Sequence, residues 1–276
     1  MTDVSERYDE AAVRYRDHWG PVIAETGLRL LDRVAPILDA APDGSLVDVG
    51  TGLGLLALTA AQRWPTLRVT GVDPSTGMLA MARDHAADAE VADRVSFVEG
   101  EAAHLPLPDA AIDLVTTAFA LQLVPDRAAA LREIRRVLRP GGWLAAVTWT
   151  DATEDFEPLA IFDDLADEWD LPEDPSGYET DPFASVRSAA DEVRAAGFSD
   201  VDAEADAVAY PFTPERYLAL LENWERDDVF GPLDEDELRD VREETLHRWS
   251  HLPSEAFIWR APVVSLVATR PADRRG

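Results

Sequence analysis

Three carboxylates, Asp48, Asp73 and Glu101, each lie at the carboxyl end of a short apolar segment of strand-like sequence. Because the carboxyl ends of parallel strands meet at one edge of a sheet, we expect these side chains to lie close together. Asp48 would complement an ammonium or sulfonium group, and Asp73 suits the two hydroxyls of a ribose. Glu101 could accept a hydrogen bond from the exocyclic amine of adenine. Together the acids predict a site for an adenosine with a cationic tail.

Two of these acids also have purely structural interpretations. Asp48 could be a buried, hydrogen-bonded acid of the core, and Asp73 could cap the helix that follows Pro74. Each acid alone leaves the two interpretations about equally open, whereas the three together with the neighbouring glycines favour a ligand site.

The glycine-rich loop Gly50-Thr51-Gly52-Leu53-Gly54 joins the first strand to a helix. Glycines there let the backbone approach a ligand, and the helix N-terminus presents free N–H groups. The loop departs from the dinucleotide fingerprint G-x-G-x-x-G/A, because Leu55 occupies the third glycine position. A pyrophosphate would also meet the carboxylate of Asp48 with no Arg nearby in the sequence.

Two alternatives from other classes remain open. One is an NAD(P)-dependent Rossmann oxidoreductase, which the loop spacing disfavours, as does the absence of any Lys for a Tyr-x-x-x-Lys pair. The other is a non-catalytic protein that keeps the adenosine site as a sensor or a scaffold.

The elements that must position these residues alternate between strand and helix as far as residue 150. Strands are expected at 46–49, 67–73, 95–98, 112–117 and 143–149, with helices between most of them and a long helical region at 5–39. This rhythm predicts an α/β fold with a doubly wound parallel sheet. Beyond residue 150 we expect helices at 159–169, 187–196 and within 213–251, and strands at 198–212 and 257–269.

We interpret residues 1–276 as a single domain. It has N-terminal covering helices at 1–40, a ligand-binding core at 45–150, and helical insertions at 151–185 and 213–251 that form a substrate lid.

Composition excludes several classes of protein. The chain has 54 acidic and 25 basic residues, a net charge of −29 and no Cys, and every basic residue is Arg. Such a charge opposes nucleic acid and anionic membranes as partners, and the lack of Cys excludes disulfides and thiolate metal sites. Without an apolar run long enough for a membrane span or a secretory leader, we expect a cytoplasmic protein. Salt adaptation and a coding bias for Arg explain the acidity about equally well, and a homodimer is left open.

The core resembles the class I S-adenosylmethionine-dependent methyltransferases, in particular the small-molecule branch of the ubiquinone/menaquinone C-methyltransferases. The matching motifs lie within residues 45–150 and read LVDVGTGLG, GVDPSTGMLAMAR, VEGEAAHLPLPDAAIDLV, TTAFALQLVPD and ALREIRRVLRPGGWLAAVTW. The resemblance implies a Rossmann-like sheet of seven strands with the last, Phe257–Thr269, antiparallel. It also implies S-adenosyl-L-methionine as cofactor and methyl transfer to a small organic acceptor.

The resemblance assigns cofactor contacts along the whole motif series. Asp48 would hold the methionine amine and Asp73 the ribose, and the opening RYDEAAVRY would form a helix over the cofactor. The implied cofactor-binding positions are Tyr8, Tyr15, Asp48, Gly50, Thr51, Gly52, Asp73, Pro74, Met78, Glu101, Ala102, Ala118 and Phe119. Two positions depart from the family: Glu101 replaces a more usual Asp, and Gln122 stands where some relatives carry His.

The acceptor side is less defined by the sequence. Methyl transfer from a sulfonium is an in-line displacement that depends mainly on alignment and needs no protein nucleophile, and no ligand spacing in the sequence supports a metal site. If the acceptor must lose a proton, His18, His247 and His251 are the candidate bases, whereas His85 and His104 are expected to be bystanders. Trp19, Gln122 and Trp224 are the candidate acceptor contacts, although the aromatic residues could equally pack the insertion helices onto the sheet.

Overall fold

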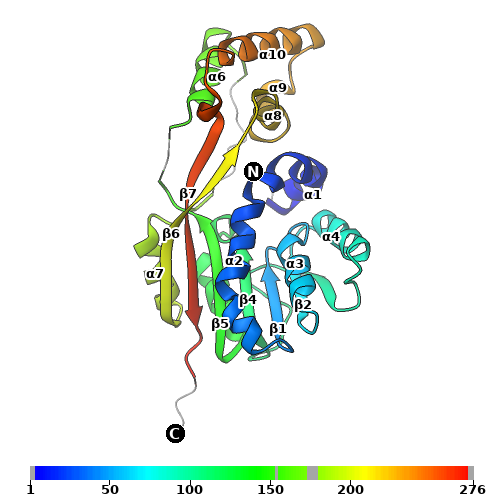
Figure 1. Cartoon of the computed structure of the whole chain (residues 1–276), viewed down its shortest axis with the longest axis vertical. Helices are drawn as coiled ribbons and strands as arrows, with labels where there is room; N and C mark the ends of the chain where they lie inside the picture. Colours follow the sequence, from blue (N-terminus) through cyan, green and yellow to red (C-terminus); the bar gives the residue numbers. More distant parts are fainter. Residues whose placement is uncertain (1–3, 153–154, 173–179, 273–276) are drawn as a thin grey trace.

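A seven-stranded sheet with the order β3-β2-β1-β4-β5-β7-β6 forms the centre of the computed structural model (Figure 1). The structure describes residues 4–152, 155–172 and 180–272. The strands are β1 Ser45–Val49, β2 Arg68–Asp73, β3 Val95–Glu99, β4 Ile112–Ala118, β5 Leu138–Trp149, β6 Ser199–Pro211 and β7 Ile258–Thr269. Strand β7 runs antiparallel to both of its neighbours, β5 and β6, so the predicted α/β fold with an antiparallel last strand is confirmed.

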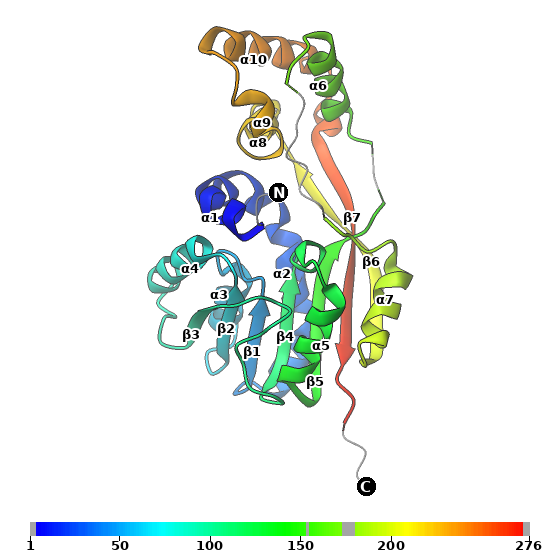
Figure 2. The same ribbon diagram turned by 180° about the vertical axis from the view of Figure 1, so that it is seen from behind.

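Helices cover both faces of the sheet because each carries one apolar stripe. On one face pack α2 (Gly20–Ala40), α3 (Leu55–Arg63) and α4 (Thr76–Asp88), through residues such as Leu30 and Leu79. On the other face, seen from behind in Figure 2, pack α5 (Arg127–Val137) and α7 (Val186–Ala195), through Leu131 and Ala189. The sheet therefore has a separate apolar core on each face, which is the doubly wound arrangement that the sequence predicted.

The N-terminal helical region is continuous but changes geometry in the middle. Helix α1 (Val4–Arg14) passes into a π-helical turn, η1 (Tyr15–Trp19), and then into α2. The turn redirects the chain, so α1 lies beyond the carboxyl ends of the strands while α2 runs down the sheet (Figure 1).

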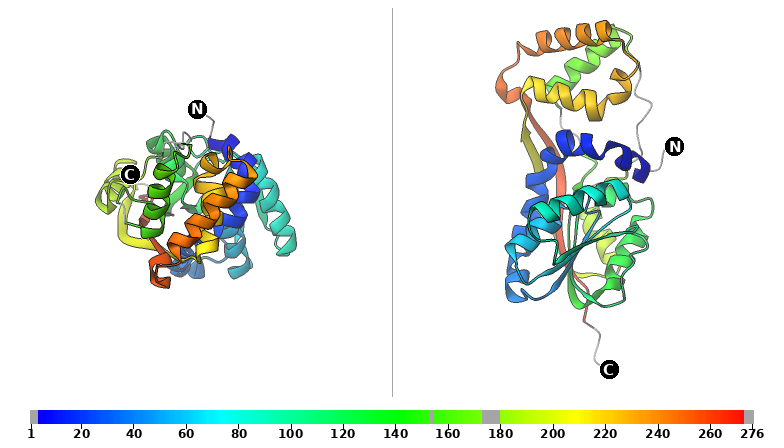
Figure 3. Two further views of the ribbon diagram at one scale, coloured as in Figure 1. Left: turned by 90° about the horizontal axis from the view of Figure 1, so that it is seen from above. Right: turned by 90° about the vertical axis from the view of Figure 1, so that its right-hand side faces the viewer.

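A helical cap stands beyond the carboxyl ends of the strands (Figure 3). Strand β5 pairs with β7 only as far as Trp149–Val263, whereas β6 and β7 stay paired up to Pro211–Ile258 and so leave the sheet as a ribbon. Between β6 and β7 the chain forms α8 (Pro214–Leu220), the π-helical η3 (Leu221–Glu225), α9 (Asp227–Phe230) and α10 (Glu235–Trp249) of the cap. Helix α6 (Glu157–Glu168), which follows β5 in the chain, completes the cap.

The cap has a core of its own. Trp249 is 1% exposed, and its indole N–H donates to the carbonyl of Pro158 at 2.9 Å. The buried rings of Phe162 and Tyr217 lie in the same part of the cap. The helical character expected for 151–185 and 213–251 is present, while residues 153–154 and 173–179 of the first insertion lie outside the described residues.

None of the helices in the described ranges is both long enough and apolar enough to cross a bilayer. The same residues contain no cluster of three or more His, Asp or Glu side chains arranged to hold a metal ion.

Candidate functional site

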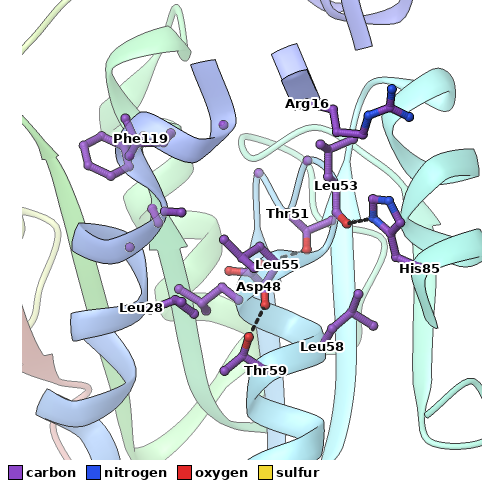
Figure 4. A pocket seen from close by; sticks show the side chains of 18 of the residues that line it. Arg16, Leu28, Asp48, Thr51, Leu53, Leu55, Leu58, Thr59, His85 and Phe119 are labelled. Atoms are coloured by element: carbon purple, nitrogen blue, oxygen red, sulfur yellow. Dashed lines mark hydrogen bonds between the residues drawn. The ribbon is translucent and has the colours of Figure 1, made fainter. Parts of the chain in front are cut away.

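A cavity of about 510 Å³ opens at the carboxyl ends of β1 and β4 (Figure 4). The glycine loop, η1, the N-terminal half of α2, most of α3 and the last turn of α4 surround it. Of the predicted positions, its lining includes Tyr15, Asp48, Gly50, Thr51, Gly52, Ala118 and Phe119. The topology therefore brings together the ends of two adjacent strands and the N-terminal cover, which are far apart in the sequence.

The glycine loop has a backbone that few other residues would tolerate. Gly50 and Gly52 have φ values of +71° and +51°, in the left-handed region. A Cβ on Gly50 would lie 2.3 Å from the Cβ of Ala120, whereas a Cβ on Gly52 would have no atom within 4 Å. Gly50 is thus required by the protein's own packing, and Gly52 faces open space beside the cavity.

Asp48 combines the two interpretations that the sequence left open. It is 2% exposed and accepts hydrogen bonds from the hydroxyls of Thr51 at 2.7 Å and Thr116 at 2.9 Å, yet it also lines the cavity. Burial raises the pKa of its carboxyl to about 7, against the opposing effect of the two hydroxyls. A cation in the cavity would therefore stabilise the ionised form of this acid.

Asp73 lies behind the glycine loop, at the end of β2. Its two oxygens accept from the backbone N–H groups of Gly52 at 2.8 Å and Ser75 at 2.9 Å. Burial raises its pKa. The alternative that Asp73 caps the next helix is wrong, because the N-cap of α4 is Ser75, whose hydroxyl accepts from the N–H of Met78.

The positions implied for the adenine lie on a more open surface. Met78 is buried, but Pro74 is exposed and the side chain of Glu101 is 75% exposed beside His104. The cavity lining includes none of the predicted positions Asp73, Pro74, Met78, Glu101 and Ala102.

Phe119 follows β4 with an unusual backbone conformation. Its φ is +55°, a region that bulky residues seldom adopt, and its ring lines the cavity while 8% exposed. Gln122 holds this conformation: its Nε2 donates to the carbonyl of Phe119 at 2.7 Å, and its Oε1 accepts from Thr148 at 2.5 Å. The amide of Gln122 is thus bonded within the protein at both its nitrogen and its oxygen, and Gln122 lies outside the cavity lining.

Two aromatic clusters lie between the core and the cap. Tyr8, Tyr15 and Trp224 have ring centroids 5.4–5.8 Å apart and join the N-terminal cover to the cap. The second cluster joins Trp19 to Trp149 and Trp259 at 5.7–6.2 Å, and Trp149 to Phe119 at 4.6 Å.

The histidines are distributed differently from the expectation. His85, expected to be a bystander, lines the cavity with its Nδ1 3.2 Å from the carbonyl oxygen of Leu53. His247, in α10, and His251, just after that helix, have ring centroids 5.6 Å apart, and His18 lies in η1. None of these last three lines the cavity.

Sequence reasoning missed Arg16, which lines the cavity and pairs with Asp17 at 2.6 Å. It also missed Asp9, which contacts the first turn of α4. Asp9 lies within the RYDEAAVRY segment expected to cover the cofactor, but only its tyrosines were singled out, and Arg16 directly follows that segment.

Comparison with known proteins gives one family match and several curated relatives. The methyltransferase-domain family model matches residues 47–146. The 27-O-demethylrifamycin SV methyltransferase of Amycolatopsis mediterranei is 39% identical over 131 residues, 48% of this chain and 48% of that protein. The ubiquinone/menaquinone biosynthesis C-methyltransferase UbiE of Geobacter sulfurreducens is 41% identical over 100 residues, 36% of this chain and 39% of that protein. The chain thus spans about half or less of the length of these curated relatives.

Solved structures extend the likeness of the fold to almost the whole chain. The [4+2]-cyclase SpnF superposes with a TM-score of 0.64 at 20% identity, covering 98% of this chain and 96% of that one. The phosphoethanolamine N-methyltransferase 2 of Haemonchus contortus, solved with S-adenosylhomocysteine, gives a TM-score of 0.59 at 19% identity, covering 98% of this chain and 59% of its own.

Proposed function

We propose that this chain, whose residues 47–146 are a class I S-adenosylmethionine-dependent methyltransferase domain of the ubiquinone/menaquinone-like branch, transfers a methyl group to a small organic acceptor. The observation that carries the proposal is the buried carboxylate of Asp48 at the wall of a cavity that the glycine loop encloses. A buried acid facing a cavity favours a cationic ligand over the pyrophosphate of a dinucleotide. The comparisons likewise favour methyl transfer over hydride transfer or a sensor role.

The cavity offers charges of both signs for the amino-acid end of the cofactor. Asp48 complements an ammonium group, and the guanidinium of Arg16, on the same lining, complements a carboxylate. Gly50, Thr51 and Gly52 would pass beneath the ligand, and Ala118 and Phe119 would flank its methionine portion. When bound, S-adenosylmethionine supplies the electrophilic methyl group.

The adenosine would extend from the glycine loop toward the end of β2. Each oxygen of Asp73 accepts one backbone N–H and retains a lone pair for a ribose hydroxyl. Pro74, Met78, Glu101 and Ala102 would then surround the adenine, with Tyr8 on the covering helix.

The acceptor would lie between the core and the cap, beside Phe119. The partly buried rings of Trp19, Trp149 and Trp259 form an apolar wall there, which suits a ring-bearing acceptor of low charge. The insertions 151–185 and 213–251, with Trp224, would act as its lid. Among the candidate bases only His18 lies on an element next to the cavity, so it is the one we retain.

The net charge of −29 also supports the absence of a nucleic-acid partner.

Calorimetric titration with S-adenosylhomocysteine and with NADH tests the cofactor assignment. We expect the wild-type chain to bind the first ligand only. Asp73→Asn should weaken binding at least about tenfold, because it removes a charged acceptor from the ribose. Asp84→Asn, at an exposed position on α4, removes the same charge and should leave the affinity unchanged. Binding of NADH instead, or full affinity in Asp73→Asn, would overturn the assignment.

Methyl transfer itself is tested with isotope-labelled S-adenosylmethionine and a pool of small organic compounds. We expect a labelled product whose acceptor carries a ring system. If cofactor binds but no compound from a broad pool is labelled, the sensor alternative gains over the enzyme.

A further inference from the structure

The carboxylate of Asp9, on the covering helix α1, reaches the first turn of α4. Its Oδ1 accepts from the hydroxyl of Ser75 at 2.6 Å and from the backbone N–H of Gly77 at 2.7 Å. The N–H groups of a first helical turn have no partner inside their own helix. Asp9, 68 residues earlier in the chain, therefore supplies the acceptor for the N–H of Gly77 that α4 does not supply itself.

Gly77 makes this contact sterically feasible. A Cβ at this position would lie 3.1 Å from the backbone oxygen of Asp9, 3.2 Å from its Oδ1 and 3.3 Å from its Cα. The backbone of α1 thus sits directly on α4, and a side chain at position 77 would require α1 to move away by a few tenths of an ångström.

Ser75 connects Asp9 to the end of β2. It is 1% exposed, its N–H donates to Asp73 at 2.9 Å, and its hydroxyl accepts from Met78 while it donates to Asp9. A single chain of hydrogen bonds, Asp9–Ser75–Asp73, therefore joins the covering helix to the carboxylate proposed for the ribose.

We propose that Asp9 is a positioning residue for cofactor binding, which holds α1 closed over the adenosine end of the site. The proposal rests on the proposed function, since the closed helix matters only if a nucleoside lies beneath it. Asp9 touches no ligand atom in this role and acts through Ser75 and Gly77.

The hydrogen bonds from Ser75 and Gly77 to Asp9 need an acceptor oxygen at position 9 but not a negative charge. Asp9 also raises the pKa of Asp73, because two like charges lie close together. Asn at position 9 would keep an acceptor oxygen and remove this repulsion, whereas Ala would remove the acceptor. The pair Asp9→Asn and Asp9→Ala therefore separates the hydrogen bonds from the charge.

The experiment combines calorimetry of S-adenosylhomocysteine with hydrogen exchange of the amides of α1. We expect Asp9→Ala to weaken binding about tenfold, the loss typical of hydrogen bonds to a charged group, and to speed exchange in α1 without ligand. Asp9→Asn should stay within about threefold of wild type. Asp84→Ala, on the exposed side of α4, is the matched control for removal of an acid and should change neither measurement.

Gly77→Ala tests the same contact from the core side with Asp9 intact. Ala favours the helical conformation of α4, so a merely structural effect would leave or improve stability. We expect the added methyl group to displace α1 and to weaken S-adenosylhomocysteine binding severalfold while thermal unfolding is not lowered.

Wild-type affinity and wild-type exchange in Asp9→Ala would overturn the role of Asp9, as would an Asp9→Asn variant that binds as poorly as Asp9→Ala. A wild-type chain that fails to bind S-adenosylhomocysteine would overturn the proposed function instead. In that case the exchange of α1 still reports whether Asp9 holds the helix.

Discussion

Burial makes the carboxylate of Asp48 selective for a cationic ligand over an anionic one. Its two hydroxyl partners, Thr51 and Thr116, come from the glycine loop and from β4, so its position is fixed before any ligand arrives. Burial disfavours its charge, and the pKa near 7 means that a bound cation has a large effect on its ionisation. The same environment would penalise an anion strongly.

The raised pKa of Asp48 predicts a pH-dependent cofactor affinity. The cofactor's ammonium favours the ionised acid, so binding should be strongest above pH 7 and weaken as the pH falls through the pKa of about 7. With one linked proton the loss approaches about tenfold per pH unit below that value. Calorimetry between pH 5.5 and 8.5 measures this dependence.

The matched variant for this prediction is Asp48→Asn, which retains the shape of the side chain. It should bind more weakly at pH 8 and show a flat profile across the same range. An equally steep profile in Asp48→Asn would assign the titration to another group.

The two π-helical turns, η1 and η3, meet where the covering helices contact the cap. Such turns interrupt regular helices and occur often at functional sites. Tyr15 of η1 and Trp224 of η3 lie 5.4 Å apart, and Tyr8 completes the cluster. Beside it, Arg14 pairs with Asp227 at 2.7 Å, with side chains 42% and 22% exposed. The aromatic contact joins α1 and η1 to η3, and the ion pair joins α1 to α9, so both join the N-terminal cover to the cap.

We expect the aromatic contact to contribute more to the stability of the fold than the ion pair between Arg14 and Asp227. Trp224 is 5% exposed, so Trp224→Ala should lower the free energy of unfolding by about 3 kcal/mol, the usual loss for a buried large ring. Asp227→Asn should cost less than about 1 kcal/mol, because the pair is partly exposed and screened. Urea unfolding followed by circular dichroism compares the two, and equal losses would show that the ion pair carries the junction.

Some surface carboxylates form ion pairs with Arg, but the acidic residues outnumber the basic ones by about two to one. Arg127 bridges Asp181 and Glu192, and Arg136 bridges Asp109 and Glu133. With 54 acidic and 25 basic residues, such networks leave many carboxylates that repel one another in the folded state.

This excess of negative charge predicts that salt stabilises the fold. Between 0.05 and 1 M KCl the thermal midpoint should rise by at least about 4 °C, which corresponds to about 1–2 kcal/mol for a chain of this size. Differential scanning calorimetry measures the midpoint. A falling midpoint would mean that screening of the Arg–carboxylate pairs outweighs screening of the repulsion, and would argue against salt adaptation.

The amino-acid sequence by itself determined the elements and their order, because the signals for them are local. The helix Thr76–Asp88 was predicted with its observed ends and the strand that ends at Asp73 to within one residue of its start, since apolar runs mark both within a few residues, whereas the capping role of Ser75 was not predicted. Acids at the ends of successive parallel strands follow from the same local pattern, and so the ligand edge of the sheet was predictable.

Only the tertiary structure decided which distant residues meet. Asp9 bonds Ser75 across 66 positions, and nothing periodic in the sequence links the two. Gln122 bonds to Phe119 and Thr148 through its amide, and His85 rather than His247 or His251 lines the cavity, because burial and packing place these side chains. Contacts of this kind depend on how the elements pack together, and that information is spread over the whole chain rather than written in any one segment.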